Sequence, residues 1–505
     1  MSYFYYTLMF FANNILEGYF MNFSKELNEN LDYIKKINNN SSDLNIRNIK
    51  IGIRQIGYVF LESTCSDDKI SNYFMKNINT IINFNKNKFF NNLFFHLKNQ
   101  ISNSKLNVLN TNEDIFYYLA SGFTIIFVDG VDKAIAIETK ANLDRGIAEP
   151  TTEVIIKGPK DAFIENYNAN LGLIRKRIKD KNLFFDELKI GKRSNTKIAI
   201  GYIDDIIDKS IVEKLKEKLE NIDIDGIIDS GNLKELIVTN KKTNFPLIKA
   251  TERPDIICQA LLAGKACIVV ENSPFVLIYP TFIIDYFRSS EDYYEKAFNI
   301  NLTRILRYFC FIITLITPAF YIALTAYNPE IVPDSLLISL AVQREGVPFP
   351  TGVEILILAI IFEILRESDV RMPTLMGASI SIVGALVLGD AAVNAGIVSP
   401  FAVIVIAITS VCALTFTDVD FINAIRWWRL LFMIGAILLG LFGILSIAVI
   451  LLIHLVNAEE MNIPFMYPIA PFDKNDDIIV KRQNKNVYRG KFTKNIVKAR
   501  LKNEN

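Results

Sequence analysis

Residues Ile305–Tyr327 read ILRYFCFIITLITPAFYIALTAY, and residues Leu430–Val456 read LLFMIGAILLGLFGILSIAVILLIHLV. A helix rises about 1.5 Å per residue, so about 20 apolar residues are needed to cross the hydrocarbon core of a bilayer. Both stretches are longer than that. They begin and end a nearly unbroken apolar block, which follows a polar chain rich in asparagine and lysine. The sequence therefore predicts a soluble region attached to membrane-spanning helices.

Three further apolar segments lie between these two, at residues 353–365, 375–395 and 397–416. The first is short for a crossing. The second is rich in glycine, alanine and serine, which let helices approach closely. Residues 417–429 contain Trp427 and Trp428 and are expected at the membrane interface. We expect an all-α multi-pass transmembrane bundle of roughly four to six segments over residues 301–457.

The charges beside the bundle constrain the number of crossings. Arg304 and Arg307 mark the start of the first apolar segment and favour a cytoplasmic soluble region. In the basic C-terminal region, 458–505, residues Lys474–Asn505 hold ten Lys/Arg against three Asp/Glu and also favour the cytoplasmic face. An even number of crossings is then required. We favour four crossings with residues 353–365 re-entrant, and keep as an alternative a hairpin hidden in the last apolar stretch.

Before the apolar block, strand-like and helical patterns alternate, which is typical of an α/β fold. Two such stretches predict two α/β subdomains, over residues 21–135 and 136–300, the second ending in a junction helix at 285–301. Residues 1–20 lack the basic region and cleavage site of a signal peptide. We expect Met21 to be the true start and residues 1–20 to be an over-extended N-terminus.

The pattern also predicts individual elements. Asp129-Gly130 indicates a hairpin turn, and residues 233–238 fit either a helix or a strand. The expected strands are 49–56, 58–62, 123–128, 133–138, 187–190, 197–202, 266–270 and 275–279. The expected helices are 22–37, 67–82, 88–100, 161–178, 208–221 and 253–263.

Composition excludes several function classes. The net charge of +1 argues against a nucleic-acid binder. Five scattered cysteines without a CxxC pair, and only two histidines, His96 and His454, argue against a zinc site. Common catalytic motifs such as GxSxG, HExxH and GxGxxG do not occur. We therefore expect a protein that is not an enzyme and that binds no metal and no cofactor.

Acidic residues in the apolar block are the stronger functional candidates, because a charge inside a bilayer costs about 2.5–3.5 kcal/mol on insertion scales. Glu354, Glu363 and Asp390 are the candidates. For Glu354 and Asp390 the alternative is a position at a segment end, within reach of the lipid headgroups. For Glu363 the alternative is an ion pair with Arg366 at helical spacing.

Several motifs, in order over roughly residues 24–472, together resemble the GerA-type family of spore germinant receptor A subunits. Ala148 stands where that family often has arginine. The positions in the soluble region that carry the resemblance are Glu149, Pro150, Glu153, Gly158, Pro159, Arg253, Pro254, Asp255, Ser273 and Pro274. The later motifs are Glu363–Glu367, Ile382–Gly389, Val398–Pro400 and Phe465–Phe472.

The resemblance implies a receptor subunit in the spore inner membrane, with its soluble region on the cytoplasmic (core) side. Its implied partners are membrane lipid, a transporter-like B subunit and a C lipoprotein, and it implies homo-oligomers that form a nutrient-gated ion path. The alternative is a non-conducting scaffold that docks the B and C subunits. Within the small-residue segment 375–395, the candidate pore-lining residues are Ile382, Gly384, Ala385 and Gly389. For Glu149, Lys157 and Arg253 we favour polar contacts between the two subdomains that stabilise the fold over ligand binding.

Overall fold

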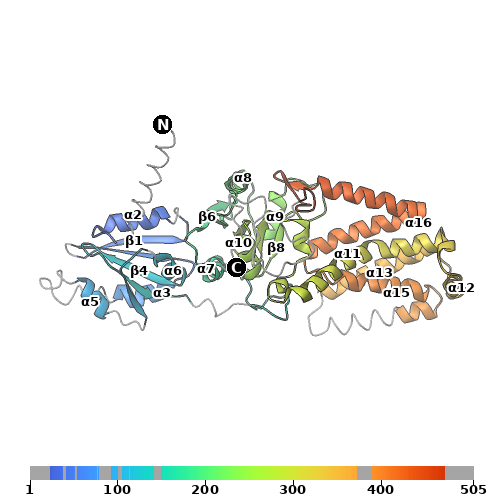
Figure 1. Cartoon of the computed structure of the whole chain (residues 1–505), viewed down its shortest axis with the longest axis horizontal. Coiled ribbons are helices and arrows are strands. Elements are labelled where there is room, and N and C mark those ends of the chain that lie inside the picture. The colour runs from blue at the N-terminus through green and yellow to red at the C-terminus, as the bar shows by residue number, and fades with distance from the viewer. Residues whose placement is uncertain are drawn as a thin grey trace, which may run out of the picture. The chain divides into compact units, whose positions relative to one another are not determined.

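The computed structural model describes residues 23–37, 41–51, 54–76, 78, 93–100, 105–112, 114–141, 149–371 and 389–472 (Figure 1). The chain forms two compact units. The α/β unit contains the described residues up to Val238 and Ile248–Pro280. The helical unit contains Thr239–Leu247 and the described residues from Thr281 onward. The predicted start at Met21 lies outside the described residues.

The first half of the α/β unit is a five-stranded antiparallel sheet covered on both faces. Helices α2 (Leu27–Ile37) and α6 (Ile115–Ala120) pack on one face, and α3 (Asp67–Ile70), the π-helix Ser71–Met75 and α5 (Leu93–Gln100) pack on the other. Alternate residues of a strand face opposite sides, so two covered faces require strands that are apolar throughout. In sheet order the strands are β1 (Leu44–Ile51), β2 (Arg54–Leu61), β4 (Phe123–Val128), β5 (Ala134–Glu138) and β3 (Leu106–Leu109).

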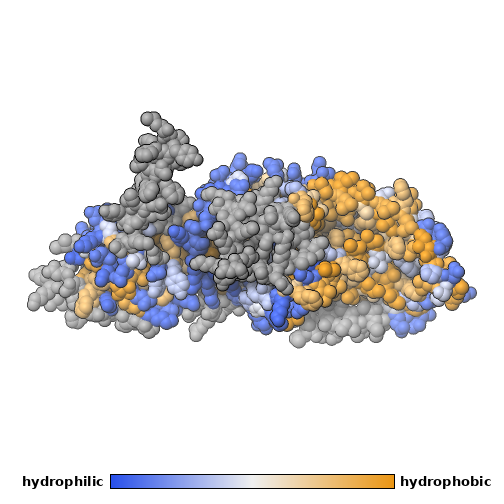
Figure 2. Space-filling view, viewed as in Figure 1, coloured by the Kyte–Doolittle hydropathy of each residue, from blue (hydrophilic) through white to orange (hydrophobic). Residues whose placement is uncertain are grey.

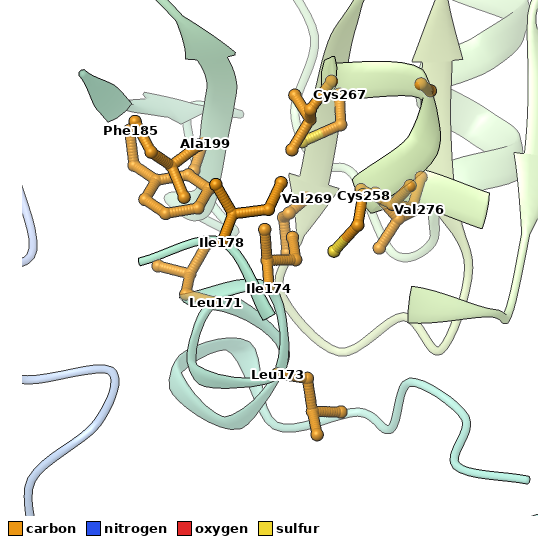
Figure 3. Close-up of a cluster of buried hydrophobic side chains, with 14 of the residues drawn as sticks. Leu171, Leu173, Ile174, Ile178, Phe185, Ala199, Cys258, Cys267, Val269 and Val276 are labelled. Carbon is orange, nitrogen blue, oxygen red and sulfur yellow. The ribbon is translucent and has the colours of Figure 1, made fainter. Parts of the chain in front are cut away.

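The second half is another five-stranded antiparallel sheet. Helices α7 (Tyr167–Arg177) and α10 (Pro254–Leu262) bury their apolar sides on one face of it, as Figure 3 shows for Leu171, Ile174 and Cys258. Helices α8 (Lys209–Glu220) and α9 (Ser230–Ile237) complete this half. In sheet order the strands are β6 (Leu183–Ile190), β7 (Thr196–Ile203), β9 (Ala266–Val270), β10 (Val276–Tyr279) and β8 (Lys249–Thr251).

The two halves share one topology. Each begins with a helix and a hairpin, continues through helices to a short strand and one more helix, and closes with a second hairpin. The strand orders β1-β2-β4-β5-β3 and β6-β7-β9-β10-β8 are equivalent. The sequence had indicated no internal repeat. The repetition is one of architecture, since the two halves fill the shared positions with different residues.

The α/β expectation and most of its elements are confirmed, with corrections. The helix expected over 161–178 begins only at Tyr167, where Asn166 caps it, and the strand expected over 49–56 is β1, which ends at Ile51. Gly57 does not separate two strands but lies inside β2, where a Cβ would meet Leu27 and Leu31 of α2 at 2.9 Å. The edge strands β3 and β8 were not predicted, because each is very short. The expected junction helix is instead two short 3-10 turns, Ile283–Tyr286 and Ser290–Tyr293.

A buried ion pair joins the two halves. Arg175 of α7 donates from Nε and Nη2 to Asp43, over 3.0 and 2.8 Å, and both side chains are almost completely buried. Its Nη1 also donates to the Leu183 carbonyl. Ser42 donates its backbone N–H to the Phe185 carbonyl, so the two sheets are also linked through the main chain.

The helical unit begins with α11 (Ala297–Ala326), which contains Pro318 and starts earlier than the expected Ile305. Helix α12 (Asp334–Gln343) follows. Helix α13 (Thr351–Arg371) is longer than the predicted 353–365, because it continues through the charged residues after Leu365. Helix α15 (Pro400–Ala413) is shorter than the predicted 397–416, because Ser399 and Pro400 begin it and turns follow Ala413.

Helix α16 (Val419–Asn457) reverses direction at Gly440, which has φ 59° and ψ −136°. The rings of Trp428 and His454 lie 5.2 Å apart, whereas in a straight helix these residues would be separated by about 39 Å. A Cβ on Gly435 would meet Ile447 at 2.9 Å, so glycine lets the two arms pack closely. This geometry is the hairpin that the sequence left open as an alternative for the last apolar stretch.

The hairpin defines two ends of the helical unit. At the turn end, Tyr327 lies against Gly440 and Gly352 lies against Ile437. At the base, the rings of Phe287, Phe416 and Phe421 pack together. In the described part of the chain, α11 and α16 are long and apolar enough to cross a membrane. Figure 2 shows the apolar surface over this unit.

We predict that Asp43→Asn lowers the free energy of unfolding of the α/β unit by about 3–5 kcal/mol, because it leaves the Arg175 charge buried without its partner. Hydrogen exchange on the full chain in detergent would measure this. Asp225→Asn is the control, because Asp225 and Arg193 form an exposed pair, and its effect should stay below about 0.5 kcal/mol. Equal effects of the two substitutions would contradict the prediction.

The same pair predicts a pH dependence. Burial raises the pKa of Asp43, but Arg175 and the hydroxyls of Ser41 and Ser63 lower it further, so the net pKa lies below its ordinary value. The stabilisation is therefore present above the ordinary carboxyl pKa and is lost as pH falls through the lowered value. Acid unfolding of the wild type should show this loss, and Asp43→Asn should lack it.

We predict that Gly440→Ala destabilises the helical unit by about 1–3 kcal/mol, because a side chain disfavours this backbone conformation and a Cβ would press against Tyr327. Thermal unfolding in detergent would measure the change. Gly389→Ala is the matched control, since its Cβ would meet Val403 at an ordinary 3.7 Å. Equal melting temperatures for the two variants would argue against the strained turn.

Candidate functional site: buried charges and an inserted segment

Glu354 is a fully buried carboxylate in the first turn of α13. Its Oε1 accepts hydrogen bonds from the backbone N–H and the hydroxyl of Ser399. Ser399 in turn caps α15 through the N–H of Ala402. Glu354 therefore lies inside the helical unit and ties α13 to the start of α15, rather than lying exposed at a helix end.

The second oxygen of Glu354 faces further polar groups. Arg344 Nε lies 3.9 Å from Oε2, and Tyr321 interacts electrostatically with both residues. Within the part of the chain that the structure describes, Glu354 Oε2, Arg344 Nε and the Tyr321 hydroxyl have no hydrogen-bond partner. A water molecule between them could satisfy all three atoms. Arg344 was not a candidate from the sequence, and Ser399 entered only as part of the Val398–Pro400 motif, although a serine before a proline is a typical helix start.

Glu363 is the centre of a second cluster. It accepts from Arg366 at 2.8 Å, which is the pair expected from helical spacing. Arg426 of α16 also donates to it, from Nε at 3.0 Å, and Arg429 Nη2 lies 3.9 Å away. The cluster therefore connects α13 to the first arm of α16, which spacing within α13 could not indicate.

The other membrane candidates are only partly described. Asp390 is exposed and Gly389 is half-buried. Ile382, Gly384 and Ala385 lie outside the described residues, so the pore-lining assignment stays a prediction.

In the α/β unit, Arg253 holds the segment that carries the resemblance motif. It binds the Asp255 carboxylate through Nε and Nη2, at 3.1 and 3.0 Å. It also donates to the backbone carbonyls of Glu153 and Pro159. The Thr251 hydroxyl donates to the buried Glu153 carboxylate. These contacts form a clamp whose partners all lie in the second half of the α/β unit. They therefore do not make the contact between subdomains that was expected for Arg253.

The remaining motif residues surround this clamp. Glu252 accepts from the backbone N–H groups of Thr152 and Glu153. Burial raises the pKa of Glu252, but these hydrogen bonds outweigh it and lower the net value. Glu149 and Lys157 are exposed, and Glu149 lies 3.9 Å from Lys160. Four other positions shape the backbone or begin helices: Pro150, Gly158, Pro254 and Pro274.

Ser273 belongs to a separate network. Its hydroxyl donates to Asp229, the N-cap of α9, and lies 2.9 Å from the Ser230 hydroxyl. Asn170 of α7 approaches the Ser273 carbonyl. Ser273 therefore links the β9–β10 turn to two helices and has a structural role here.

A cavity of about 360 Å³ opens in the α/β unit, between the first sheet and α7. Lys140, Lys176 and Lys179 line it together with Tyr117 and Ser121. Lys179 lies over the Tyr117 ring, 4.7 Å from its centroid. Glu138 also lines the cavity, so its charged lining is mixed, and its volume is within the range of small-molecule pockets.

Sequence patterns did not reveal that Thr239–Leu247 belongs to the helical unit. Glu460 accepts from the backbone N–H and the hydroxyl of Thr239. Thr243 Oγ1 lies 2.9 Å from His454 Nε2, and Trp428 donates to Asn244 at 3.1 Å. This inserted segment thus contacts both arms of α16. The chain leaves the α/β unit after α9, passes through the helical unit and returns to β8.

No group of three or more potential metal ligands occurs in the described ranges. The geometry thus consists of charges that join helices, a clamp that orders a loop, and a segment of the helical unit that is inserted in the sequence of the α/β unit.

We predict that Arg253→Lys weakens the clamp by about 2 kcal/mol or more, because lysine cannot reproduce the fork of hydrogen bonds to Asp255 and two carbonyls. Faster hydrogen exchange in residues 151–159 would show it. Lys157→Arg, a change at an exposed position in the same loop, is the control and should leave exchange unchanged.

Comparison with known proteins places this architecture among spore germination proteins. The family model described as Bacillus/Clostridium GerA spore germination protein matches residues 32–492. Spore germination protein KA of Bacillus subtilis (strain 168) is 41% identical over 360 residues, or 71% of this chain and 66% of that relative, just under two thirds of its length. Spore germination protein GerLA of Bacillus cereus is 36% identical over 458 residues, covering 90% of this chain and 91% of that relative.

Among solved structures, the N-terminal domain of the A subunit of the Bacillus megaterium spore germinant receptor GerK3 is similar. It is 29% identical, with a TM-score of 0.40, over 52% of this chain and 97% of that chain.

Proposed function

Because the chain belongs to the GerA family of spore germination proteins, we propose that it is the A-type subunit of a nutrient-responsive germinant receptor in the spore inner membrane. The observation that carries this proposal is the family match over residues 32–492, which includes both units. A role in germination follows from the relatives, which are themselves spore germination proteins. The partners in this proposal are a transporter-like B subunit and a C lipoprotein.

The helical unit is the proposed membrane anchor. Tyr327 at the end of α11 and Gly440 of α16 meet at the turn end, while both ends of α16 lie at the base. Helix α13 begins near the turn end and α15 ends at the base. The hairpin of α16 replaces one membrane crossing by two and so supports an even number of crossings. The chain would then enter and leave the membrane on one side, the cytoplasmic side favoured by Arg304, Arg307 and the basic tail.

Within this receptor we propose that several copies assemble around an ion path. The small-residue segment 375–395 would line it, with Ile382, Gly384, Ala385 and Gly389 facing the ions, because small residues permit close helix packing. The inserted segment Thr239–Leu247 supports coupling of the α/β unit to the helices, since it contacts both arms of α16 and continues directly into β8. The second candidate function is a non-conducting scaffold, which the ion pairs that join the helices would equally serve.

Two measurements test these functions. Spores that lack the gene should lose the response to at least one nutrient of a panel and regain it on complementation. The purified chain in liposomes should pass ions if it forms the path, whereas a scaffold should give no flux while spores still need it.

We predict that Ala385→Cys, in the assembled receptor, reacts with a water-soluble thiol reagent. The native Cys310 is buried in α11 and is the internal control that should not react. Mass spectrometry of the labelled peptides would separate the two sites. An Ala385→Cys thiol as unreactive as Cys310 would count against this segment as the lining.

A further inference from the structure

Three guanidinium groups surround the single Glu363 carboxylate at the boundary of the apolar surface. Arg366 and Arg426 donate to it directly, and Arg429 lies within 3.9 Å. Arg426 also donates to Asn423, which carries no charge. Glu367 interacts electrostatically with Arg366, so even with this second carboxylate the cluster keeps a positive charge.

The arginines are held where this charge is hard to neutralise. Arg429 has a side chain only 12% exposed, and it interacts electrostatically with Arg366, a like charge. Among the residues with described structure, the buried Nε atoms of Arg366 and Arg429 have no hydrogen-bond partner. Two neighbouring guanidiniums that share one carboxylate favour a further anion with several acceptor oxygens.

The position of the cluster indicates which anion is available. The apolar run of α13 ends at Leu365, and the apolar run of the first arm of α16 begins at Leu430. Charged residues from the two helices therefore meet where their apolar surfaces end. Trp427, next to Arg426, is 64% exposed, and exposed tryptophan at such a boundary is typical of the headgroup level of a membrane. Leu431, one residue past this level, is also exposed.

We propose that Arg366, Arg426 and Arg429 form a binding site for the phosphate of an anionic phospholipid headgroup. The guanidiniums bind the phosphate oxygens, and Trp427 and Leu431 contact the glycerol and upper acyl region. This inference rests on the proposed membrane location of the helical unit. Free inorganic phosphate offers the same oxygens, but it would leave the exposed Trp427 and Leu431 without a partner.

The chain contains two tryptophans, Trp427 and Trp428. Trp428 is buried against Asn244 and His454, so quenching by lipid reports mainly on the exposed Trp427 beside the cluster. The full chain is placed in phosphatidylcholine vesicles that contain increasing fractions of brominated phosphatidylglycerol or of brominated phosphatidylcholine. Bromine quenches tryptophan only nearby. We expect brominated phosphatidylglycerol to reach half-maximal quenching at a membrane fraction at least about five-fold below the fraction that brominated phosphatidylcholine requires. A preference of about five-fold is what the attraction of one arginine gives.

Substitutions and competition identify the site. Arg429→Gln should abolish the preference and Arg429→Lys should retain part of it. Arg193→Gln, which removes an equal charge from an exposed position in the α/β unit, should leave the preference unchanged. If inorganic phosphate at equal concentration displaces the brominated anionic lipid, the inference that the bound anion is a lipid headgroup is overturned.

The outcomes separate this inference from the proposed function. Equal quenching by both brominated lipids in the wild type overturns the phosphate site but leaves the membrane location intact. If Arg429→Gln has wild-type thermal stability and still prefers the anionic lipid, the phosphate site is also overturned. If this variant fails to fold, the comparison of the two brominated lipids with the wild-type protein decides whether the site exists. Absence of quenching by either lipid contradicts the membrane location itself.

Discussion

The reversal of α16 at Gly440 is the constraint on which the helical unit depends. Because the backbone turns there, one apolar stretch supplies two antiparallel arms, and Trp428 and His454 meet at the base. The inserted segment Thr239–Leu247 can then bind both arms at once, through Asn244 and Thr243. A straight helix would place these partners on residues about 39 Å apart. The turn therefore determines both the packing of the helices and their contacts with the inserted segment of the same unit.

Charge burial follows the same logic in both units. The buried Glu354 and Asp43 are each paired with groups from a different element, so each charge is stabilised only when those elements are assembled. Glu363 is half-buried and is paired both with Arg366 of its own helix and with Arg426 of α16. Buried ion pairs add little net stability, but a broken one costs several kcal/mol. The result is specificity. Helices that slide against one another, or subdomains that separate, would leave a charge without its partner.

Local patterns predicted local structure well. The Asp129-Gly130 hairpin, α8 and the α/β class follow from periodicity and turn chemistry, and the motifs identified the family. Four features depend on contacts between distant residues and could not be predicted: the shared topology of the two sheets, the Arg426–Glu363 pair, the Glu354–Ser399 contact and the insertion of Thr239–Leu247. The lengths of α13 and α15 were predicted wrongly, because the prediction ended each helix where its apolar residues end. A helix ends instead where its backbone is capped.

Within the described residues, the chain crosses the border between its two units after Val238, after Leu247 and after Pro280. Each unit therefore needs residues encoded on both sides of the other. A single recombination breakpoint near residue 280 would bring an α/β region together with a foreign helical unit, and Phe245 and Leu247, which are buried now, would meet surfaces that did not evolve with them. Two units interleaved in this way are inherited together, so new variants are expected to arise by duplication of the whole gene rather than by exchange of its parts.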